Sequence, residues 1–343
     1  MDAERTRNET VQLVFLLTSL VFVFAVFFLT PSLRPASLIT VVNLLFMAPA
    51  VRFLMRKKVP KVPAILILFV IYGFLLVFGA IHAVRILISQ WASLVSTLPV
   101  LGESVIFKLG RMQTDLQTSL GIEFDFGVDN WLINLQKNIQ TWTFTNAPTI
   151  IGDVAAAGFL SPVFAFFLLK DGDQWKNEIR KLMPERYRTT TVHVVDRISE
   201  AVIKFLRAKV LEALLVGVLC YIGLKIIAAP YAGIFALIAG VTNIIPYLGP
   251  VLGSVPALIL IGFSDQYVSL FWPAFFVFAI VNLVDNVLIF PVFVAKLVNL
   301  SPLTLLVSVA VGQEFYGLVG MLLAVPFASS IKIIFQELRG LLY

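Results

Sequence analysis

Ionisable and amide side chains inside long apolar runs are the strongest chemical signals in this 343-residue sequence. Asp285 and Asn286 lie near the end of one such run, and Asn282 precedes them by about one helical turn, so the three share one side of a helix. A carboxylate and amide oxygens in this arrangement are suited to coordinating a sodium ion or holding a polar solute. The alternative is an anchor between helices or a position at the outer interface.

Glu314 lies beside Gln313 inside the last apolar run. An ionisable group at membrane depth normally faces a cavity or a partner, because exposure to lipid is costly. Burial also disfavours the charged form of a carboxyl group, which makes Glu314 a candidate proton carrier. The alternative is that the run 302–334 is too long for one span and that Glu314 lies in a water-filled break or near an interface.

A group of prolines and glycines interrupts the apolar run 232–262, where Pro246, Gly249 and Pro250 fall close together. A helix cannot continue through them, because each proline removes a donor and crowds the preceding turn. Broken membrane helices with polar neighbours are typical of transport pathways, and Asn243 just before the break is a candidate lining residue. The alternative is a tightly packed kink whose hydrogen bonds Asn243 completes. The sequence leaves open whether 232–262 spans once or turns back.

A charged turn follows the fourth apolar run and contains Lys170, Asp171 and Asp173. We expect a helix to stop here and the next to begin with Asp173 as its N-cap. The alternative is a gate or coupling element.

Composition indicates an integral membrane protein. The chain is 59% hydrophobic and 13% charged, against about 25% charged in soluble domains. Its net charge of +6 comes from basic residues that flank apolar runs, which indicates membrane topology rather than a nucleic-acid partner. One cysteine and two distant histidines predict no metal site, and the motifs of nucleotide-hydrolysing, zinc-hydrolytic and serine-hydrolytic enzymes are missing from the sequence. We therefore expect neither an enzyme nor a cofactor.

The apolar runs predict an all-α polytopic protein with about eight transmembrane helices, one of them broken or re-entrant. The expected spans are 11–30, 36–54, 63–89, 151–169, 210–228, 232–262, 267–290 and 302–334. The first is expected to remain attached, since no small-residue cleavage site follows it. Basic residues crowd the second-to-third and fourth-to-fifth connections, which predicts that both connections and both termini are cytoplasmic.

These spans divide the chain into five expected parts. They are the first three spans (1–89), extracytoplasmic amphipathic helices joined at Gly121–Gly127 (90–150), the fourth span (151–169), cytoplasmic amphipathic helices (170–209) and a C-terminal membrane core (210–343). The inner helix that begins near Thr191 is expected to run directly into the fifth span. The outer amphipathic helices are expected to pack on the membrane bundle, and the alternatives are contact with other subunits, a lid over a pathway or a position on the lipid surface.

Four segments carry a family resemblance over nearly the whole chain. They are 166–173, 244–250 with Pro256 following, Asp285-Asn286 with Pro291 following, and 317–326. Together, in this order and with this span pattern, they resemble the AI-2E (autoinducer-2 exporter) family of bacterial membrane proteins. The resemblance implies an inner-membrane location, export of a small polar solute such as autoinducer-2 by some members, sodium/proton or related cation antiport by others, and a homo-oligomer, with a pentamer as one form.

Three functions remain open at this point. The first is export of a small polar solute, autoinducer-2-like, along a path lined by 240–256, with Asp285 and Glu314 supplying polar or proton-linked sites. The second is sodium, lithium or potassium exchange for protons on the same scaffold. The third is a non-transporting assembly scaffold in the lipid bilayer, built on the amphipathic helices.

Overall fold

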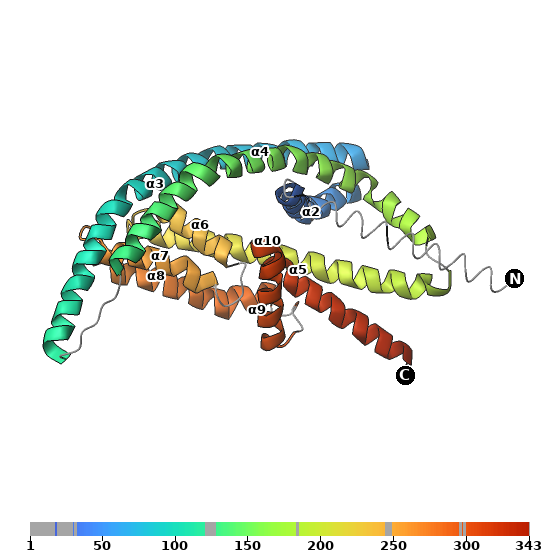
Figure 1. The fold of residues 1–343 in the computed structure, drawn as a ribbon. Coiled ribbons are helices and arrows are strands. Elements are labelled where there is room, and N and C mark those ends of the chain that lie inside the picture. The colour runs from blue at the N-terminus through green and yellow to red at the C-terminus, as the bar shows by residue number, and fades with distance from the viewer. Residues whose placement is uncertain are drawn as a thin grey trace.

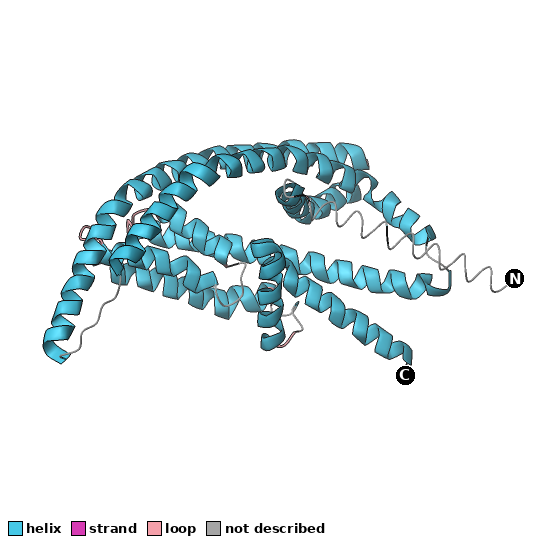
Figure 2. Cartoon of the chain, in the orientation of Figure 1, coloured by secondary structure: helices cyan, strands magenta, loops and turns pink. Residues whose placement is uncertain are grey.

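The structure is a computed structural model that describes residues 18, 30, 33–120, 128–182, 185–243, 249–294, 297 and 300–342. All regular elements within these ranges are helical (Figure 2), which confirms the all-α prediction for this part of the chain. The first expected span, apart from Thr18 and Thr30, lies outside the described residues. So do Pro246 and the expected turn at Gly121–Gly127.

Two long helices, α3 (Lys61–Leu120) and α4 (Val128–Leu182), run side by side as a curved pair along the upper edge of the molecule (Figure 1). Helix α2 (Leu33–Arg56) packs against both. Buried Asn43 links the three helices, because its Nδ2 donates to Ser161 Oγ at 3.2 Å and its Oδ1 accepts from the Tyr72 hydroxyl at 3.0 Å. Such polar links between helices are typical of membrane bundles.

Helix α3 is continuous across position 90 and α4 across position 150, where we placed the limits of the outer amphipathic segment. In α3 the reason is visible in the sequence, since no glycine or proline occurs between residues 80 and 98. The division of these helices into spanning and extracytoplasmic parts remains a prediction.

The expected helix stop at Lys170, Asp171 and Asp173 is wrong, because α4 continues through this turn to Leu182. A single glycine such as Gly172 costs a helix only about 1 kcal/mol relative to alanine, which neighbouring contacts readily offset. Asp173 does not act as the N-cap of a new helix. Its carboxylate pairs instead with Lys61 Nζ at 2.6 Å and joins the C-terminal part of α4 to the start of α3.

Helix α5 (Glu185–Ile226) is central to the C-terminal half and packs on α2, α6, α8 and α10. Its course confirms that the inner amphipathic helix runs without interruption into the fifth apolar run. The helix begins at Glu185, earlier than the expected start near Thr191.

The broken segment 232–262 turns back on itself. Helices α6 (Ala232–Thr242) and α7 (Gly249–Phe263) pack against each other. Thr242 Oγ1 donates to the Gly249 carbonyl at 2.9 Å, and we call this junction between the end of α6 and the start of α7 the neck. Further along, a Cβ on Gly253 would lie 2.6 Å from Ala239 Cα. Glycine at these positions lets the two arms touch, so the segment is a helical hairpin rather than one broken span.

The last apolar run also bends sharply. Helix α10 (Pro302–Leu342) contains Gly317 at φ 57°, in the left-handed region, and the chain changes direction within it (Figure 1). A Cβ on Gly312 would lie 2.3 Å from the Gly320 carbonyl oxygen, whereas eight residues of straight helix would separate the two positions by about 12 Å. The run expected as one span at 302–334 is therefore two helical limbs that meet near Gly317.

The remaining described elements connect the α6–α7 hairpin to the bent helix α10. They are η1 (Val268–Leu270, a 3₁₀ helix), α8 (Phe271–Val284), η2 (Asp285–Ile289, a π-helical segment) and α9 (Phe290–Phe293). Helix α8 packs on α5 and α7, and this places η2 beside α5.

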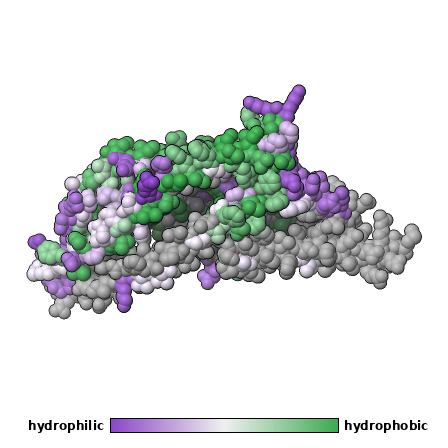
Figure 3. All heavy atoms as spheres, turned by 90° about the horizontal axis from the view of Figure 1, so that it is seen from above, coloured by the Kyte–Doolittle hydropathy of each residue, from purple (hydrophilic) through white to green (hydrophobic). Residues whose placement is uncertain are grey.

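Four helical stretches among the described residues are long and apolar enough to cross a membrane. They are Ile39–Arg56, Lys61–Ser119, Val268–Phe293 and Gly320–Glu337, and three shorter apolar helices accompany them at Ala232–Thr242, Leu252–Phe263 and Leu303–Phe315. Apolar side chains cover much of the coloured surface in Figure 3, as expected for contact with lipid. The count of eight spans remains a prediction.

Charged residues join α4 to α5 beyond these apolar stretches. Asp196 of α5 pairs with Lys176 Nζ at 2.5 Å and with Arg180 Nη2 at 2.9 Å, both from α4. The hydrogen bond from Lys176, with the charges of both cations, lowers the pKa of the Asp196 carboxyl below its usual value. The carboxylate therefore holds the two helices together in its charged form.

Replacing Asp196 by asparagine is expected to lower the melting temperature of the detergent-solubilised protein at neutral pH. Because the pKa of Asp196 is depressed in the folded state, its stabilisation is present above the ordinary aspartate pKa and is lost as the pH falls through the folded value. The difference between wild type and Asp196→Asn should therefore shrink on acidification. Glu200→Gln is the matched control, since Glu200 pairs with Lys204 at 2.7 Å within one helix and its pKa is also lowered. Equal losses for the two variants would contradict a link between helices.

Replacing Gly249 by alanine is expected to destabilise the hairpin. The added Cβ would lie 2.3 Å from the Thr242 carbonyl oxygen and 2.5 Å from Asn243 Cα, and these backbone atoms cannot move away without opening the neck. Overpacking of this kind costs about 1–3 kcal/mol. Gly158→Ala in α4 is the control, because nothing lies within 4 Å of its new Cβ. Thermal unfolding of both variants checks this, and a Gly249→Ala protein as stable as wild type would refute the close approach.

Candidate functional site

Four buried polar residues from three segments meet in the apolar interior. Lys209 and Glu212 lie on α5, Asn243 ends α6, and Asp285 begins η2. Their exposed fractions are 2%, 1%, 3% and 5%, respectively. We call these four residues the buried charge cluster.

Direct contacts hold the buried charge cluster together. Lys209 Nζ lies 2.9 Å from Glu212 Oε2 and donates to the Asn243 carbonyl oxygen at 3.0 Å. The Asn243 side-chain amide donates to Asp285 Oδ2 at 3.3 Å and to Glu212 Oε1 at 3.5 Å. These two bonds are at the long end of hydrogen-bond geometry, so Asn243 bridges the carboxylates without fully compensating either one.

The charges in the cluster do not balance. One ammonium group faces two carboxyl groups, so with all three ionised the cluster carries one net negative charge. The Asp285 Oδ1 atom is also buried and accepts no hydrogen bond from the described residues. A buried carboxylate without a full set of partners is strongly unfavourable, so a positive species is favoured at this point.

Local sequence explains why the three segments meet. Helices α5 and α6 approach closely at Gly217 and Gly240, where a Cβ on Gly240 would lie 2.9 Å from the Ala213 carbonyl oxygen. This contact brings Asn243, one turn further along α6, to the level of Glu212 on α5. Asp285 lies where α8 changes to the π-helical η2, and such changes of helical pitch occur frequently at functional sites.

A small cavity of about 20 Å³ adjoins Asp285. Its lining is mostly apolar and is formed by Val216, Cys220, Ala239, Asn243, Phe278, Val281, Asn282 and Asp285. Asn282 is exposed and forms one edge of the cavity, so the cavity lies close to the protein surface. A space of this size holds one water-sized species.

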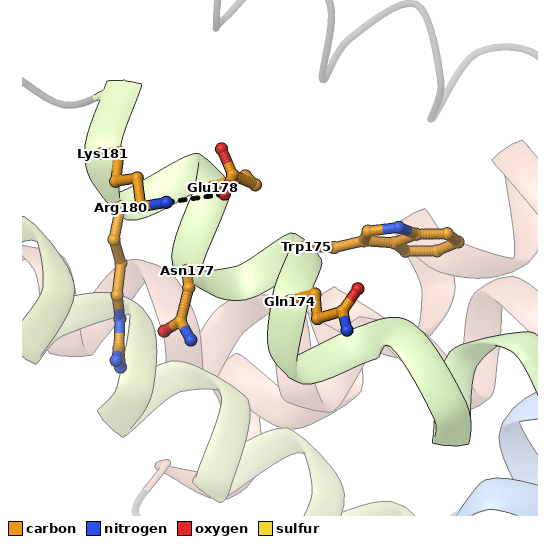
Figure 4. Close-up of a pocket in the computed structure, with 6 residues that line it drawn as sticks. All are labelled: Gln174, Trp175, Asn177, Glu178, Arg180 and Lys181. Atoms are coloured by element: carbon orange, nitrogen blue, oxygen red, sulfur yellow. Dashed lines mark hydrogen bonds and ion pairs between the residues drawn. The ribbon is translucent and has the colours of Figure 1, made fainter.

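A larger pocket of about 570 Å³ lies at the charged end of α4, but it has no comparable chemistry. Figure 4 shows that its lining residues all come from this one helix: Gln174, Trp175, Asn177, Glu178, Arg180 and Lys181. Lys181 already pairs with Glu178 at 2.8 Å, and Arg180 with Asp196. The pocket is broad and open, and its cations are neutralised by neighbours.

The structure brings only some of the sequence-predicted site residues together. Asn243 and Asp285 are in direct contact, and Asn282 borders their cavity. Asn286 is exposed and its side-chain amide donates to Asn282 Oδ1 at 2.6 Å, so it stays on the outer side of the same helix. Gly249 is buried at the neck of the hairpin.

The other predicted residues lie elsewhere. Pro250 is in the first turn of α7, and Pro246 is outside the described residues. Gln313 and Glu314 are exposed on α10, in the turn before Gly317. Lys170 Nζ lies 3.7 Å from Asp171 Oδ1 on the continuous α4, and Asp173 pairs with Lys61.

Sequence reasoning missed Lys209 and Glu212. Lys209 counted as one of the cytoplasmic cations before the fifth span, and Glu212 belongs to none of the predicted sites. The usable signal was their three-residue spacing at the start of an apolar run, which puts opposite charges on one helical face. Among the described residues, no three or more His, Cys, Asp or Glu side chains form a group that would hold a metal ion.

The long apolar helices, the α6–α7 hairpin and the bent helix α10 together define a multi-pass membrane protein. A family model described as AI-2E family transporter matches residues 16–340. The chain therefore belongs to the AI-2E family of bacterial membrane transporters and is not an enzyme.

Relatives in this family carry names that indicate different functions. YueF of Bacillus subtilis, a putative transport protein, is 29% identical in an alignment 344 residues long. The alignment covers 96% of this chain and 91% of YueF. The AI-2 transport protein TqsA of Escherichia coli is 25% identical over 293 residues (85% of this chain and 82% of TqsA). A sodium-lithium/proton antiporter of Halobacillus andaensis is 25% identical over 330 residues (91% of each chain).

Asn243→Ala is expected to destabilise the protein by about 1–3 kcal/mol, because it removes the donor shared by two buried carboxyl groups. Asn286→Ala is the matched control, since Asn286 is exposed and bonds only within its own helix among the described residues. Thermal unfolding in detergent measures both. If the two variants lose the same stability, Asn243 does not hold the cluster together.

Proposed function

We propose that this transporter exchanges a monovalent cation for a proton and that the buried charge cluster is the exchange site. The observation that carries the proposal is the uneven charge count: one ammonium group against two carboxyl groups, with Asp285 Oδ1 unpaired among the described residues and beside a cavity. Sodium, lithium and potassium are the cations to be compared.

The charge count supports exchange because a proton and a cation neutralise the same negative charge. A proton on Asp285 or Glu212 makes the cluster neutral, and so does one monovalent cation beside Asp285. Both together leave an excess positive charge in a low-dielectric interior, which disfavours double occupancy. Competition for a single site is the basis of obligatory exchange.

The surroundings of Asp285 fit a small cation better than an organic solute. The cavity of about 20 Å³ accommodates one water-sized species. Asp285, Asn243 and Asn282, which carry carboxylate and amide oxygens, are among its lining residues, and hard cations prefer oxygen ligands of these kinds. Among the described residues, the Cys220 thiol is the one other ionisable group in the lining, and Lys209 and Glu212 face Asp285 from α5.

Export of a small polar solute, such as an autoinducer-2-like molecule, is the second candidate function. The similarity to TqsA supports it, and the hairpin α6–α7 supplies the kind of irregular backbone that lines solute pathways. This function requires a passage much wider than the cavity beside Asp285.

Several further expectations stay with the proposal. Gln313 and Glu314, near the bend of α10, are proposed as a second polar site on the ion or solute pathway. Lys170, Asp171 and Asp173 are proposed as coupling residues. The proposal also includes a homo-oligomer, an inner-membrane location and both termini in the cytoplasm. A non-transporting scaffold remains the competing proposal if no flux is found.

Proton flux in liposomes tests the proposal. The purified protein is reconstituted with an internal pH dye under an imposed pH gradient, and sodium, lithium or potassium chloride is added outside. Wild type should move protons in response to at least one cation, and Asp285→Asn should reduce the initial rate at least about tenfold, because the variant lacks the exchangeable charge.

Glu314→Gln is the matched variant, since it neutralises an exposed carboxyl group far along the chain. Because Glu314 is proposed only as a second polar residue, the proposal expects Glu314→Gln to reduce cation-dependent flux less than Asp285→Asn does. Loss of flux in Glu314→Gln but not in Asp285→Asn would move the exchange site to the bend of α10. A wild-type protein with no cation response, but with efflux of a labelled polar solute, would replace exchange by solute export.

A further inference from the structure

We infer that Lys209 is a built-in counter-charge that restricts the buried charge cluster to monovalent cations and excludes divalent ones. The inference rests on the proposed exchange function and adds the residue that determines selectivity. It concerns a side chain that does not line the cavity and therefore does not select ions by direct contact.

The position of Lys209 is fixed from two sides. Its ammonium group lies 2.9 Å from Glu212 Oε2 on its own helix and 3.0 Å from the Asn243 carbonyl oxygen at the end of α6. The side chain is almost completely buried. Lys209 therefore places its ammonium group inside the cluster and leaves the space beside Asp285 free.

The charge balance explains selectivity. With Lys209 in place, the cluster lacks one positive charge, which a single monovalent cation or proton supplies. A divalent cation would leave the cluster with one excess positive charge in a buried, low-dielectric site. Without Lys209 two positive charges are missing, and two neighbouring carboxylates are favourable ligands for a divalent ion.

The geometry makes this change local. Glu212 Oε1 and Asp285 Oδ2 both accept from the same Asn243 amide, so the two carboxyl groups are already held on either side of one donor. Removing the ammonium group releases Glu212 Oε2 from its ion pair. Both carboxylates are then available to a single ion with only a side-chain adjustment.

Manganese binding to the purified full-length protein in detergent tests the inference. Free Mn²⁺ is measured by electron paramagnetic resonance as protein is added, without any need for transport. Wild type should bind Mn²⁺ no more tightly than the surface background defined by Asp285→Asn. Lys209→Gln should bind it at least about tenfold more tightly, and sodium should compete poorly.

Two control variants separate charge from shape. Lys209→Arg keeps the positive charge and should leave Mn²⁺ binding at the wild-type level. The double variant Lys209→Gln/Glu212→Gln removes one positive and one negative charge, restores the wild-type balance and should lose the Mn²⁺ affinity gained by Lys209→Gln. Elution volume and melting temperature establish that each variant is folded.

Folded Lys209→Gln protein that binds Mn²⁺ no better than wild type overturns the inference. So does a double variant that keeps the gained affinity, because its charge balance equals that of wild type. If Lys209→Gln does not fold, Glu212→Gln decides instead. In this variant one ammonium group faces one carboxylate, so the cluster is already neutral and sodium should no longer release a proton on binding. This loss is expected although Glu212 does not line the cavity. If sodium still releases a proton from the variant, the inference is overturned.

Failure of the proposed function gives a different result. In that case wild type shows no cation-linked proton movement in liposomes or in detergent, whatever the Mn²⁺ data. If wild type exchanges cations for protons but Lys209→Gln gains no affinity for Mn²⁺, only the role of Lys209 is rejected.

Discussion

An unequal number of opposite charges, held away from water, is the constraint on which the rest of this structure depends. Lys209 alone faces the carboxyl groups of Glu212 and Asp285 among the described residues, and all three are buried. The interior of a membrane protein supplies no solvent to screen the remaining charge, so the free energy of the folded state depends on a proton or a cation. In the proposed function, this dependence provides the transport chemistry, because the neutralising species can be exchanged.

The hairpin α6–α7 makes this arrangement possible. Its neck requires glycine at 249, and its packing on α5 requires glycine at 240, because side chains there would meet backbone atoms. These contacts hold Asn243 between two helices that are distant in sequence, where its amide bridges both carboxyl groups. The bend of α10 uses the same principle at Gly312, whereas Gly317 is required there by its left-handed backbone conformation. Glu314 beside the bend is exposed.

The helical class, the membrane location and the break in 232–262 were predictable from the sequence, and two of the candidate site residues chosen from it, Asn243 and Asp285, lie in contact in the structure. Prolines and glycines interrupt a membrane helix, and polar residues in apolar runs require partners there. It was not predictable that the segment turns back, since this depends on contacts of Gly249 and Gly253 across the neck.

Lys209 and Glu212 were missed because a lysine at the edge of an apolar run resembles a topology signal. Only the packing of α6 against α5 reveals that it is buried. The false helix stop at Asp173 came from reading local propensity where the Lys61 ion pair supports a continuous helix.

The most direct test of the central claim is the number of protons released per sodium ion bound by the purified protein in weakly buffered solution. If one negative charge is neutralised by either species, the ratio approaches one where the cluster is protonated. It falls toward zero at higher pH, where the proton has already left, and the release is lost when Asp285 is replaced by asparagine. Sodium binding without proton release at any pH, or release that survives the loss of Asp285, would contradict this account.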